Sequence, residues 1–275
     1  MADKTWNGTG GTNGDLSDAA NWTPSGVPTT SDDVRFTASY TQAVSANLNA
    51  LTGVTLGSVV IEKGYSGAIG DTTNDLDLTC TRFEFAGSGV SYIDLQASNI
   101  TAIVHETAVA SAIGQRGLYL IGSNIAELIV ASGYIGLASR HGTTATAASV
   151  RASGGDVLLG SGATVTNIEN HGGSIETATG ATTAKNFSGR LTTKEASAIT
   201  TITVEGGTVN DSSTGTITTL NLEDGQYSVV YGYTKTITTI NQNGGRLYYD
   251  PNNVTVSTHN LATDSVPKFV TVTEG

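Results

Sequence analysis

The sequence predicts an all-β fold, a single-chain parallel β-helix that we expect to be right-handed, with a capping segment at each end. One observation behind this prediction is a repeat: the stretches ITTITVEGGTVN, ITTLNLEDGQYS and ITTINQNGGRLY begin at Ile199, Ile217 and Ile237. The other is the composition. The 275 residues include 34 Gly and only 13% charged side chains, so the long charged residues that favour helices are scarce.

The repeat extends well beyond these three stretches. When the sequence is aligned on the glycine at the bend of each unit, seven units follow one another at spacings of 16 to 22 residues. A near-constant period over about residues 123–249 is typical of a repeat architecture. The aligned glycines are Gly133, Gly155, Gly173, Gly189, Gly207, Gly225 and Gly245.

Each unit is predicted to form a strand, a tight glycine bend and a second strand. Alternate residues before the glycine are apolar, which is the period of a β-strand, and another apolar residue follows two positions after it. The unit around Gly189 fits least well, because Ala184 and Asn186 stand where larger apolar groups are expected. The clearest predicted core positions are Ile202, Val204, Leu220, Leu222 and Ile240.

The length of the unit indicates how the strands are arranged. About 18 residues at about 3.3 Å each make a circuit of roughly 60 Å, enough for one three-sided turn of a β-helix. Successive rungs would stack about 4.8 Å apart, so that aligned residues form internal columns. The period is too short for a propeller blade, and a leucine-rich repeat would show regular Leu and Asn positions.

The two ends of the chain depart from the repeat. Residues 1–50 carry both tryptophans and irregular, glycine-rich stretches, and we predict a separate cap or docking segment there. The β-helix is assigned to residues 51–249. Residues 250–275 lose the glycine register and contain Pro251 and Pro267, so we predict a second cap or a contact arm.

The N-terminal motifs carry a resemblance to a known class of protein. The stretches TWNGTGG, AANWTPSGVP and SDDVRF, followed by YSGAIG and rungs of the VEGG type, resemble β-helical phage virion proteins of the head-decoration, cement or fibre kind. They are also similar to the N-terminal part of some bacterial surface β-helix proteins. The phage resemblance implies an accessory virion role as a homotrimer bound to the major capsid protein, and it carries over no catalytic residue.

The same N-terminal segment supplies the predicted contact residues. Exposed aromatic side chains are common anchors at protein interfaces, so we expect this segment to contact the capsid or neighbouring subunits. The residues assigned to this role are Trp6, Trp22, Pro28 and Phe36.

Charge and cysteine usage argue against several other classes. A net charge of -11 without any Lys/Arg cluster disfavours binding to nucleic acid. The single Cys80 cannot form an internal disulfide, and no apolar run approaches the roughly 20 residues of a membrane span. The N-terminus does not resemble a secretory signal, so we expect synthesis in the host cytoplasm and a final place on the capsid surface of a virion.

Acidic residues on the repeat are candidate catalytic groups. Glu205 and Glu223 occupy the same column and could stack at the separation of a retaining glycosidase pair. The next unit has Gln242 and Asn243 instead, which favours a solvated polar face. No enzymatic activity is therefore predicted, although a tailspike-like carbohydrate-active protein remains an alternative.

Metal and cofactor sites have little support in the sequence. The loop DTTNDLD offers Asp71, Asp75 and Asp77 as oxygen ligands, but it lacks the fixed glycine and terminal Glu of a calcium loop. The histidines do not have the spacing of a zinc site, and we predict neither metal nor cofactor. These histidines are His105, His141, His171 and His259.

The sequence therefore favours a non-enzymatic phage virion structural protein that decorates or stabilises the capsid through protein contacts. A tailspike-like carbohydrate-binding or carbohydrate-cleaving β-helix and a bacterial surface adhesin are the alternatives. Pairs of exposed threonines in successive units are expected to form ladders outside the helix, where they could pack against a symmetry mate.

Overall fold

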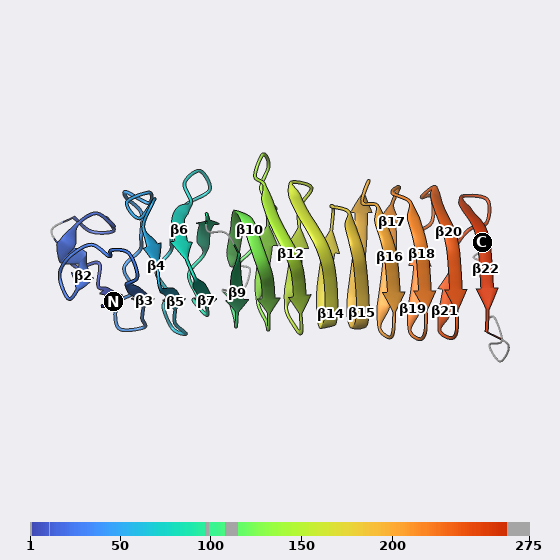
Figure 1. The fold of residues 1–275 in the computed structure, drawn as a ribbon, viewed down its shortest axis with the longest axis horizontal. Helices are drawn as coiled ribbons and strands as arrows, with labels where there is room; N and C mark the ends of the chain where they lie inside the picture. The colour runs from blue at the N-terminus through green and yellow to red at the C-terminus, as the bar shows by residue number, and fades with distance from the viewer. Residues whose placement is uncertain (1, 11, 97–98, 108–114, 263–275) are drawn as a thin grey trace.

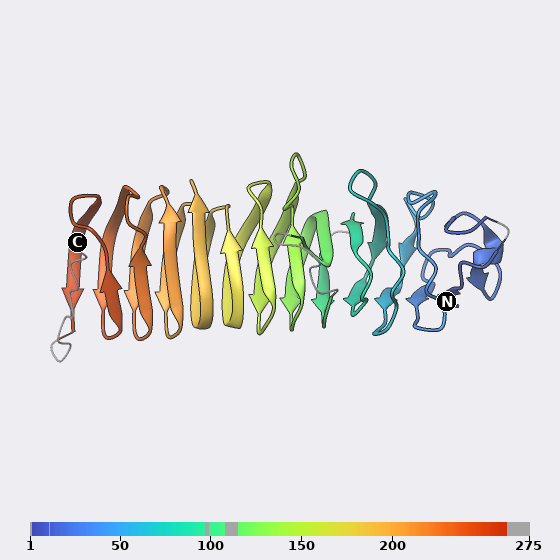
Figure 2. The same ribbon diagram turned by 180° about the vertical axis from the view of Figure 1, so that it is seen from behind.

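A computed structural model describes residues 2–10, 12–96, 99–107 and 115–262 of the chain. It shows parallel β-coils stacked along one axis, from the N-terminal end to the C-terminal end, which confirms the predicted fold class (Figure 1). Strands on the near side run downward in Figure 1, and the strands nearest the viewer in the C-terminal half of Figure 2 run upward. Because the chain advances along the axis at the same time, the winding is right-handed.

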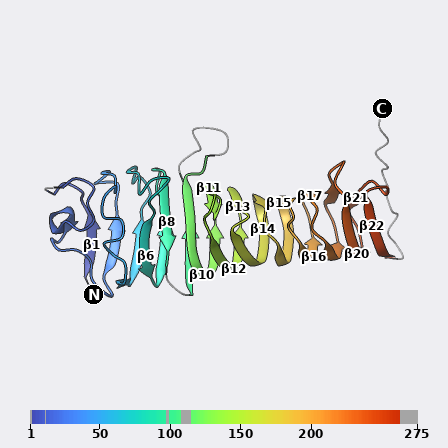
Figure 3. The same cartoon turned by 90° about the horizontal axis from the view of Figure 1, so that it is seen from above.

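Most coils contribute two strands, and each strand pairs in parallel with its counterparts in the neighbouring coils. Figure 3 shows the same stack from above. Besides a short 3-10 helix η1 (Ala19–Asn21), the elements are β1 (Asp3–Trp6), β2 (Trp22–Thr23), β3 (Asp33–Phe36), β4 (Thr55–Leu56), β5 (Ser58–Ile61), β6 (Leu76–Cys80), β7 (Arg82–Phe85), β8 (Ser91–Leu95), β9 (Ile100–Val104), β10 (Leu118–Val130), β11 (Tyr134–Leu137), β12 (Ala145–Ala152), β13 (Asp156–Leu159), β14 (Ala163–Thr177), β15 (Ala181–Glu195), β16 (Ile199–Val204), β17 (Thr208–Ser213), β18 (Ile217–Leu222), β19 (Gln226–Val229), β20 (Lys235–Gln242), β21 (Arg246–Tyr248) and β22 (Val254–Leu261).

The apolar columns of the repeat form the core. Ile202 pairs with Leu220 in the next coil and Leu220 pairs with Ile240, while Val204 pairs with Leu222. All five side chains are fully buried. Neighbouring strands lie about 4.8 Å apart, so each column is a continuous apolar stripe along the axis.

Each coil of the regular part bends at three places. In β16 the alternation of buried and exposed residues is broken by Thr200 and Thr201, which both face outward. A strand that keeps two consecutive side chains outside must turn between them. The glycine bend at 205–207 and the turn at 214–216 close the circuit, so the coil has three sides although it contains two strands.

Glycine is required at the bends because successive bends touch. Gly207 has a φ of 65°, and a Cβ atom built on it would lie 2.4 Å from the carbonyl oxygen of Gly189 in the coil before. Gly173 differs from the other aligned glycines, since its φ is not in the left-handed region. A Cβ there would still lie 2.7 Å from the carbonyl oxygen of Gly154.

Two buried asparagines explain the irregular unit around Gly189. Asn170 and Asn186 point into the core, where the amide of Asn170 donates to the side-chain oxygen of Asn186 over 2.8 Å. The Asn170 side chain also accepts a hydrogen bond from the backbone N–H of Gly173, and Asn186 donates to the carbonyl of Gly206. These amides satisfy backbone groups at the bends, so polar residues replace apolar ones without leaving buried groups unpaired.

The N-terminal segment is continuous with the β-helix, which corrects the separate cap predicted over residues 1–50. Strand β3 pairs in parallel with β5 on one side and with β1 on the other. The N-terminal edge of the β-helix is covered by the short strand β2. This strand pairs antiparallel with β1 through Trp22 and Trp6, on the edge of β1 opposite to β3, so the cap is shorter than predicted.

The β-helix also extends further towards the C-terminus than predicted. Strand β22 pairs in parallel with β20 along seven residues, so the segment after residue 250 adds a coil in place of an arm. Its side chains are mostly exposed, unlike those of the coils before it. Pro267 and the rest of 263–275 lie outside the described residues.

Candidate functional sites

The aromatic residues predicted to contact a partner lie inside the β-helix. Trp6, Trp22 and Phe36 are no more than 1% exposed, and Pro28 is buried as well. The rings of Trp6 and Trp22 meet edge to face with centroids 5.2 Å apart, and Phe36 makes a similar contact with Tyr65. The predicted surface role is therefore wrong for these side chains: they fill the core of the first coils, where large rings replace the aliphatic columns found later.

The repeat acids Glu205 and Glu223 lie on the solvated surface of the bends, where both are exposed. The two oxygens of Glu223 accept hydrogen bonds of 3.0 and 2.9 Å from the amide of Asn243 in the next coil. In this column, Glu223 therefore has an amide, that of Asn243, as its partner in the next coil, and the contact lies on a solvated surface.

The loop DTTNDLD does not gather its aspartates around one point. Asp71 closes its own turn by accepting hydrogen bonds from Thr73 and Asn74, and these bonds hold the pKa of its carboxyl well below the usual range. Asp77 accepts a hydrogen bond of 3.1 Å from Thr52. Within the described residues, no group of three or more His, Cys, Asp or Glu side chains is arranged to hold a metal ion.

Asp75 instead pairs with Arg140, which reaches back from a later coil. Both side chains are 14% exposed and form an ion pair. The guanidinium lies 5.1 Å from the ring centre of Tyr92 and 5.9 Å from that of Tyr119, and these two rings are stacked in parallel at 4.8 Å. The next position of this column is Gly136, which ends the stack of rings. These contacts hold the loops that carry Asp75 and Arg140 against the side of the β-helix.

Two carboxylates, those of Asp77 and Asp94, lie near this ion pair. Asp77 on β6 and Asp94 on β8 are register partners in adjacent coils, and both face outward. Burial raises the pKa of Asp94, and the charges of Asp77 and Asp75 raise it further, while a hydrogen bond with Gln96 opposes them. Asp94 and Gln96 line a groove of about 510 Å³, and Asp77 lines a neighbouring groove of about 490 Å³.

This arrangement has the elements of an acid–base pair, since the pKa of Asp94 is raised and a second carboxyl group is its register partner. In the sequence, Asp77 stands out only as a candidate metal ligand, and no pattern indicates Asp94. The two residues are 17 positions apart, close to the length of a coil, but the insertions in these early coils hide the register.

The histidines and the cysteine are separate from one another. His105 lies 3.7 Å from Glu84, and His171 lies 3.3 Å from Glu169 on another coil. Cys80 is buried, and burial raises its pKa to about 12, so the thiol is unreactive at neutral pH. His141 is exposed, and burial lowers the pKa of the half-buried His259.

The most strongly buried charged site lies inside the regular coils, where a core column changes from apolar to polar. Successive positions of this column are Leu159, Thr177, Thr193, Asp211 and Val229. The carboxylate of Asp211 therefore points into the core, and its side chain is 0% exposed.

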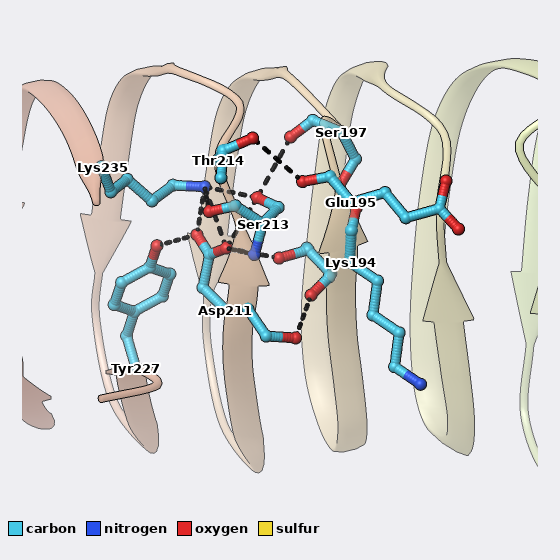
Figure 4. A network of polar contacts seen from close by, with 10 residues as sticks. Lys194, Glu195, Ser197, Asp211, Ser213, Thr214, Tyr227 and Lys235 are labelled. Carbon is cyan, nitrogen blue, oxygen red and sulfur yellow. Dashed lines mark hydrogen bonds and ion pairs between the residues drawn. The ribbon is translucent and has the colours of Figure 1, made fainter. Parts of the chain in front are cut away.

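Lys235 lies opposite this carboxylate (Figure 4). Its ammonium group is 2.7 Å from Oδ2 and 2.9 Å from Oδ1 of Asp211, and its side chain is 1% exposed. The phenol of Tyr227 donates to Oδ2, the hydroxyl of Thr193 donates to Oδ1 over 2.6 Å, and Nζ donates to Oγ of Ser213 over 2.6 Å. We refer to these five residues as the Asp211 network.

The environment of the network shifts two of its pKa values. Burial lowers the pKa of Lys235, and the charge of Asp211 acts against that effect. Burial also raises the pKa of Tyr227 well above its usual range, so its phenol stays protonated and remains a hydrogen-bond donor. The network is absent from the predictions made from the sequence, although the strand period indicates it: Asp211 and Lys235 each lie two residues from a core position, at Val209 and Ile237.

No helix among the described residues is long and apolar enough to cross a membrane. Comparisons with models of protein families, with curated proteins and with solved structures found no match to this chain.

Proposed function

We propose that this protein is a non-enzymatic structural component of a phage virion that decorates or stabilises the capsid. It would act as a rigid rod bound to the major capsid protein and to copies of itself. The observation that carries the proposal is the continuous parallel pairing, which runs from β1 through β3 to β22 in the described coils. The resemblance of the N-terminal motifs to virion proteins supports it.

The outer surface suits lateral packing of copies. One outward column consists of Thr201, Thr219, Thr239 and Thr258, each the register partner of the one before. A straight column of short, uncharged side chains gives a flat face, and homo-oligomers pack such repeated faces around a symmetry axis. A homotrimer with these faces turned inward is part of the proposal.

The test is to locate the protein on particles made by cells that carry its gene. We expect immunogold labelling on the capsid surface, and mass spectrometry of purified particles should find the protein in fixed ratio to the major capsid protein. Light scattering of the purified protein should give three chains of 28.1 kDa. Absence from purified particles would contradict the virion role, and a monomer at all concentrations would contradict the trimer.

The Asp77–Asp94 pair favours a second candidate function, the binding and cleavage of a polysaccharide. Neighbouring strands are about 4.8 Å apart, and retaining glycosidases hold their carboxyl groups about 5–5.5 Å apart. Asp94, with its raised pKa, would protonate the leaving oxygen, and Asp77 would be the second carboxyl group of the pair. The grooves beside both residues are open to a linear chain.

If this second function exists, Asp94→Asn should lower the release of reducing ends from a polysaccharide substrate by about 10²–10⁴-fold. Cleavage by the unmodified protein should fall as pH rises through the raised pKa of Asp94, because the acid is then deprotonated. Glu223→Gln is the matched control, since it neutralises an exposed acid away from the grooves. Equal activity in both variants would exclude the pair as the catalytic acid and base.

A further inference from the structure

The Asp211 network takes no part in either proposed function, and it contains a nucleophile held against an electrophile. We propose that Lys235 and Asp211 condense into an intramolecular amide bond that joins β20 to β17. The proposal stands on the geometry of the buried pair and is independent of the virion role. It assigns a self-modification site to the protein, with no external substrate or cofactor.

The reacting atoms are already in contact. Nζ of Lys235 is 2.7 and 2.9 Å from the two carboxyl oxygens of Asp211, so it is also about 3 Å from Cγ, which is the separation of a near-attack arrangement. Neither side chain can move away, because both are at most 1% exposed and the surrounding coils are closely packed. The fold thus keeps the two groups together for the lifetime of the protein.

Burial favours the free amine of Lys235, although the charge of Asp211 acts against that effect. An ammonium–carboxylate pair is poorly solvated in a dry core, and moving one proton from Lys235 to Asp211 converts it into an amine and a carboxylic acid. Burial lowers the pKa of Lys235, which assists this transfer. The free amine is the form that can attack Cγ.

The neighbours of the pair are positioned to support the attack. Tyr227 donates a hydrogen bond to Oδ2 and Thr193 donates one to Oδ1, so negative charge that develops on either oxygen meets a hydroxyl donor. Oγ of Ser213 accepts a hydrogen bond of 2.6 Å from Nζ and so helps to orient the amine beside the carboxyl group. Figure 4 shows Tyr227, Ser213 and Lys235 gathered around the carboxylate of Asp211.

The step balances without an oxidant, reductant or activating group. The Nζ–Cγ bond forms, one Cγ–O bond breaks, and the oxygen leaves as water with two protons that the ammonium group carried. An ammonium and a carboxylate are thereby replaced by one neutral amide and one water molecule. Because the chain has a single cysteine, this bond is a way for it to gain an internal cross-link without a disulfide.

The cross-link would tie together coils near the C-terminal end of the described stack. Asp211 lies on β17 and Lys235 begins β20. The bond would therefore close a loop of chain that contains β18 and β19. The last coils of a solenoid are the first to fray, since each is held by neighbours on fewer sides. A covalent tie at this point resists separation of the coils.

The experiment is mass spectrometry of the denatured, purified protein. We expect its mass to be lower than that of the sequence by one water, and a protease digest should contain a branched peptide in which Asp211 is joined to Lys235. The branched peptide is needed because Asp224–Gly225 could also lose one water by forming a cyclic imide. That modification would lie in a linear peptide.

Three variants complete the test. Lys235→Met should abolish the branched peptide, whereas Lys194→Met, which removes an exposed lysine on β15, should retain it. Tyr227→Phe keeps the ring and both reacting groups but loses the donor to Oδ2, so it should form the bond more slowly. The proposal is overturned if folded, aged protein has the full sequence mass, or if its digest has lost water only in linear peptides and contains no branched peptide of Asp211 and Lys235.

Discussion

Replacement of Lys235 by methionine is expected to lower the free energy of unfolding by about 3–5 kcal/mol, because it leaves the carboxylate of Asp211 buried without its cationic partner. Tyr227 and Thr193 still donate to that carboxylate, but they do not neutralise its charge. The loss is expected whether the native pair is ionic or joined as an amide, since the substitution removes both. Urea unfolding followed by circular dichroism measures it.

The double variant Lys235→Met with Asp211→Leu provides the control. Replacing a complete buried ion pair by apolar residues of similar volume is often neutral or stabilising, so the double variant should recover most of the stability that the single variant loses. Val229, the next residue of the same column, shows that an aliphatic side chain fits this part of the core. A single variant that loses less than about 1 kcal/mol would show that Asp211 is readily solvated or protonated when unpaired.

Gly207→Ala is expected to destabilise the protein by about 2–5 kcal/mol, from left-handed backbone strain and from overpacking against the coil before it. The φ of Gly207 is 65°, and the added methyl group would lie 2.4 Å from the carbonyl oxygen of Gly189. Backbone atoms cannot move aside as a flexible side chain can. Thermal unfolding of the two proteins under the same conditions gives the difference.

Gly232→Ala is the matched control for this prediction. Gly232 also has a positive φ, of 85°, but a Cβ atom there would meet nothing within 4 Å. It should therefore show only the conformational penalty of about 1–2 kcal/mol. Similar losses in Gly207→Ala and Gly232→Ala would mean that strain alone governs the bends and that the contact between coils is unimportant.

The regular half of the fold could be predicted well from the sequence, because the two-residue period of the strands and the regular spacing of the glycines are both present there. The strand period places Ile202 and Val204 on one side, and the spacing of the glycines sets the register between coils. Together they determine which side chains meet, so the core columns could be derived without coordinates. Where insertions break the spacing, as between Asp77 and Asp94, the same reasoning could not align the coils.

The interpretation of the ends failed for a different reason. Trp6, Trp22 and Phe36 fall on no repeat, and an aromatic residue outside a recognisable pattern serves equally well as a core residue or as an interface anchor. Only the pairing of β1 with β3 and β2 distinguishes these roles, and that pairing joins segments with no shared motif. The Asp211 network follows from the strand period alone, because Asp211 and Lys235 each lie two residues from an apolar core position, but a charged side chain is not expected in an apolar column.

The short strand β2 limits how copies of this protein could assemble. A parallel solenoid can be extended by any chain that adds a further rung in the same direction, but β2 lies antiparallel on the outer edge of β1 and already pairs with Thr5 and Trp6, two of its four residues. A second copy that added a parallel rung at the N-terminal end would have to displace β2. We therefore expect end-to-end stacking of copies to be disfavoured at this end.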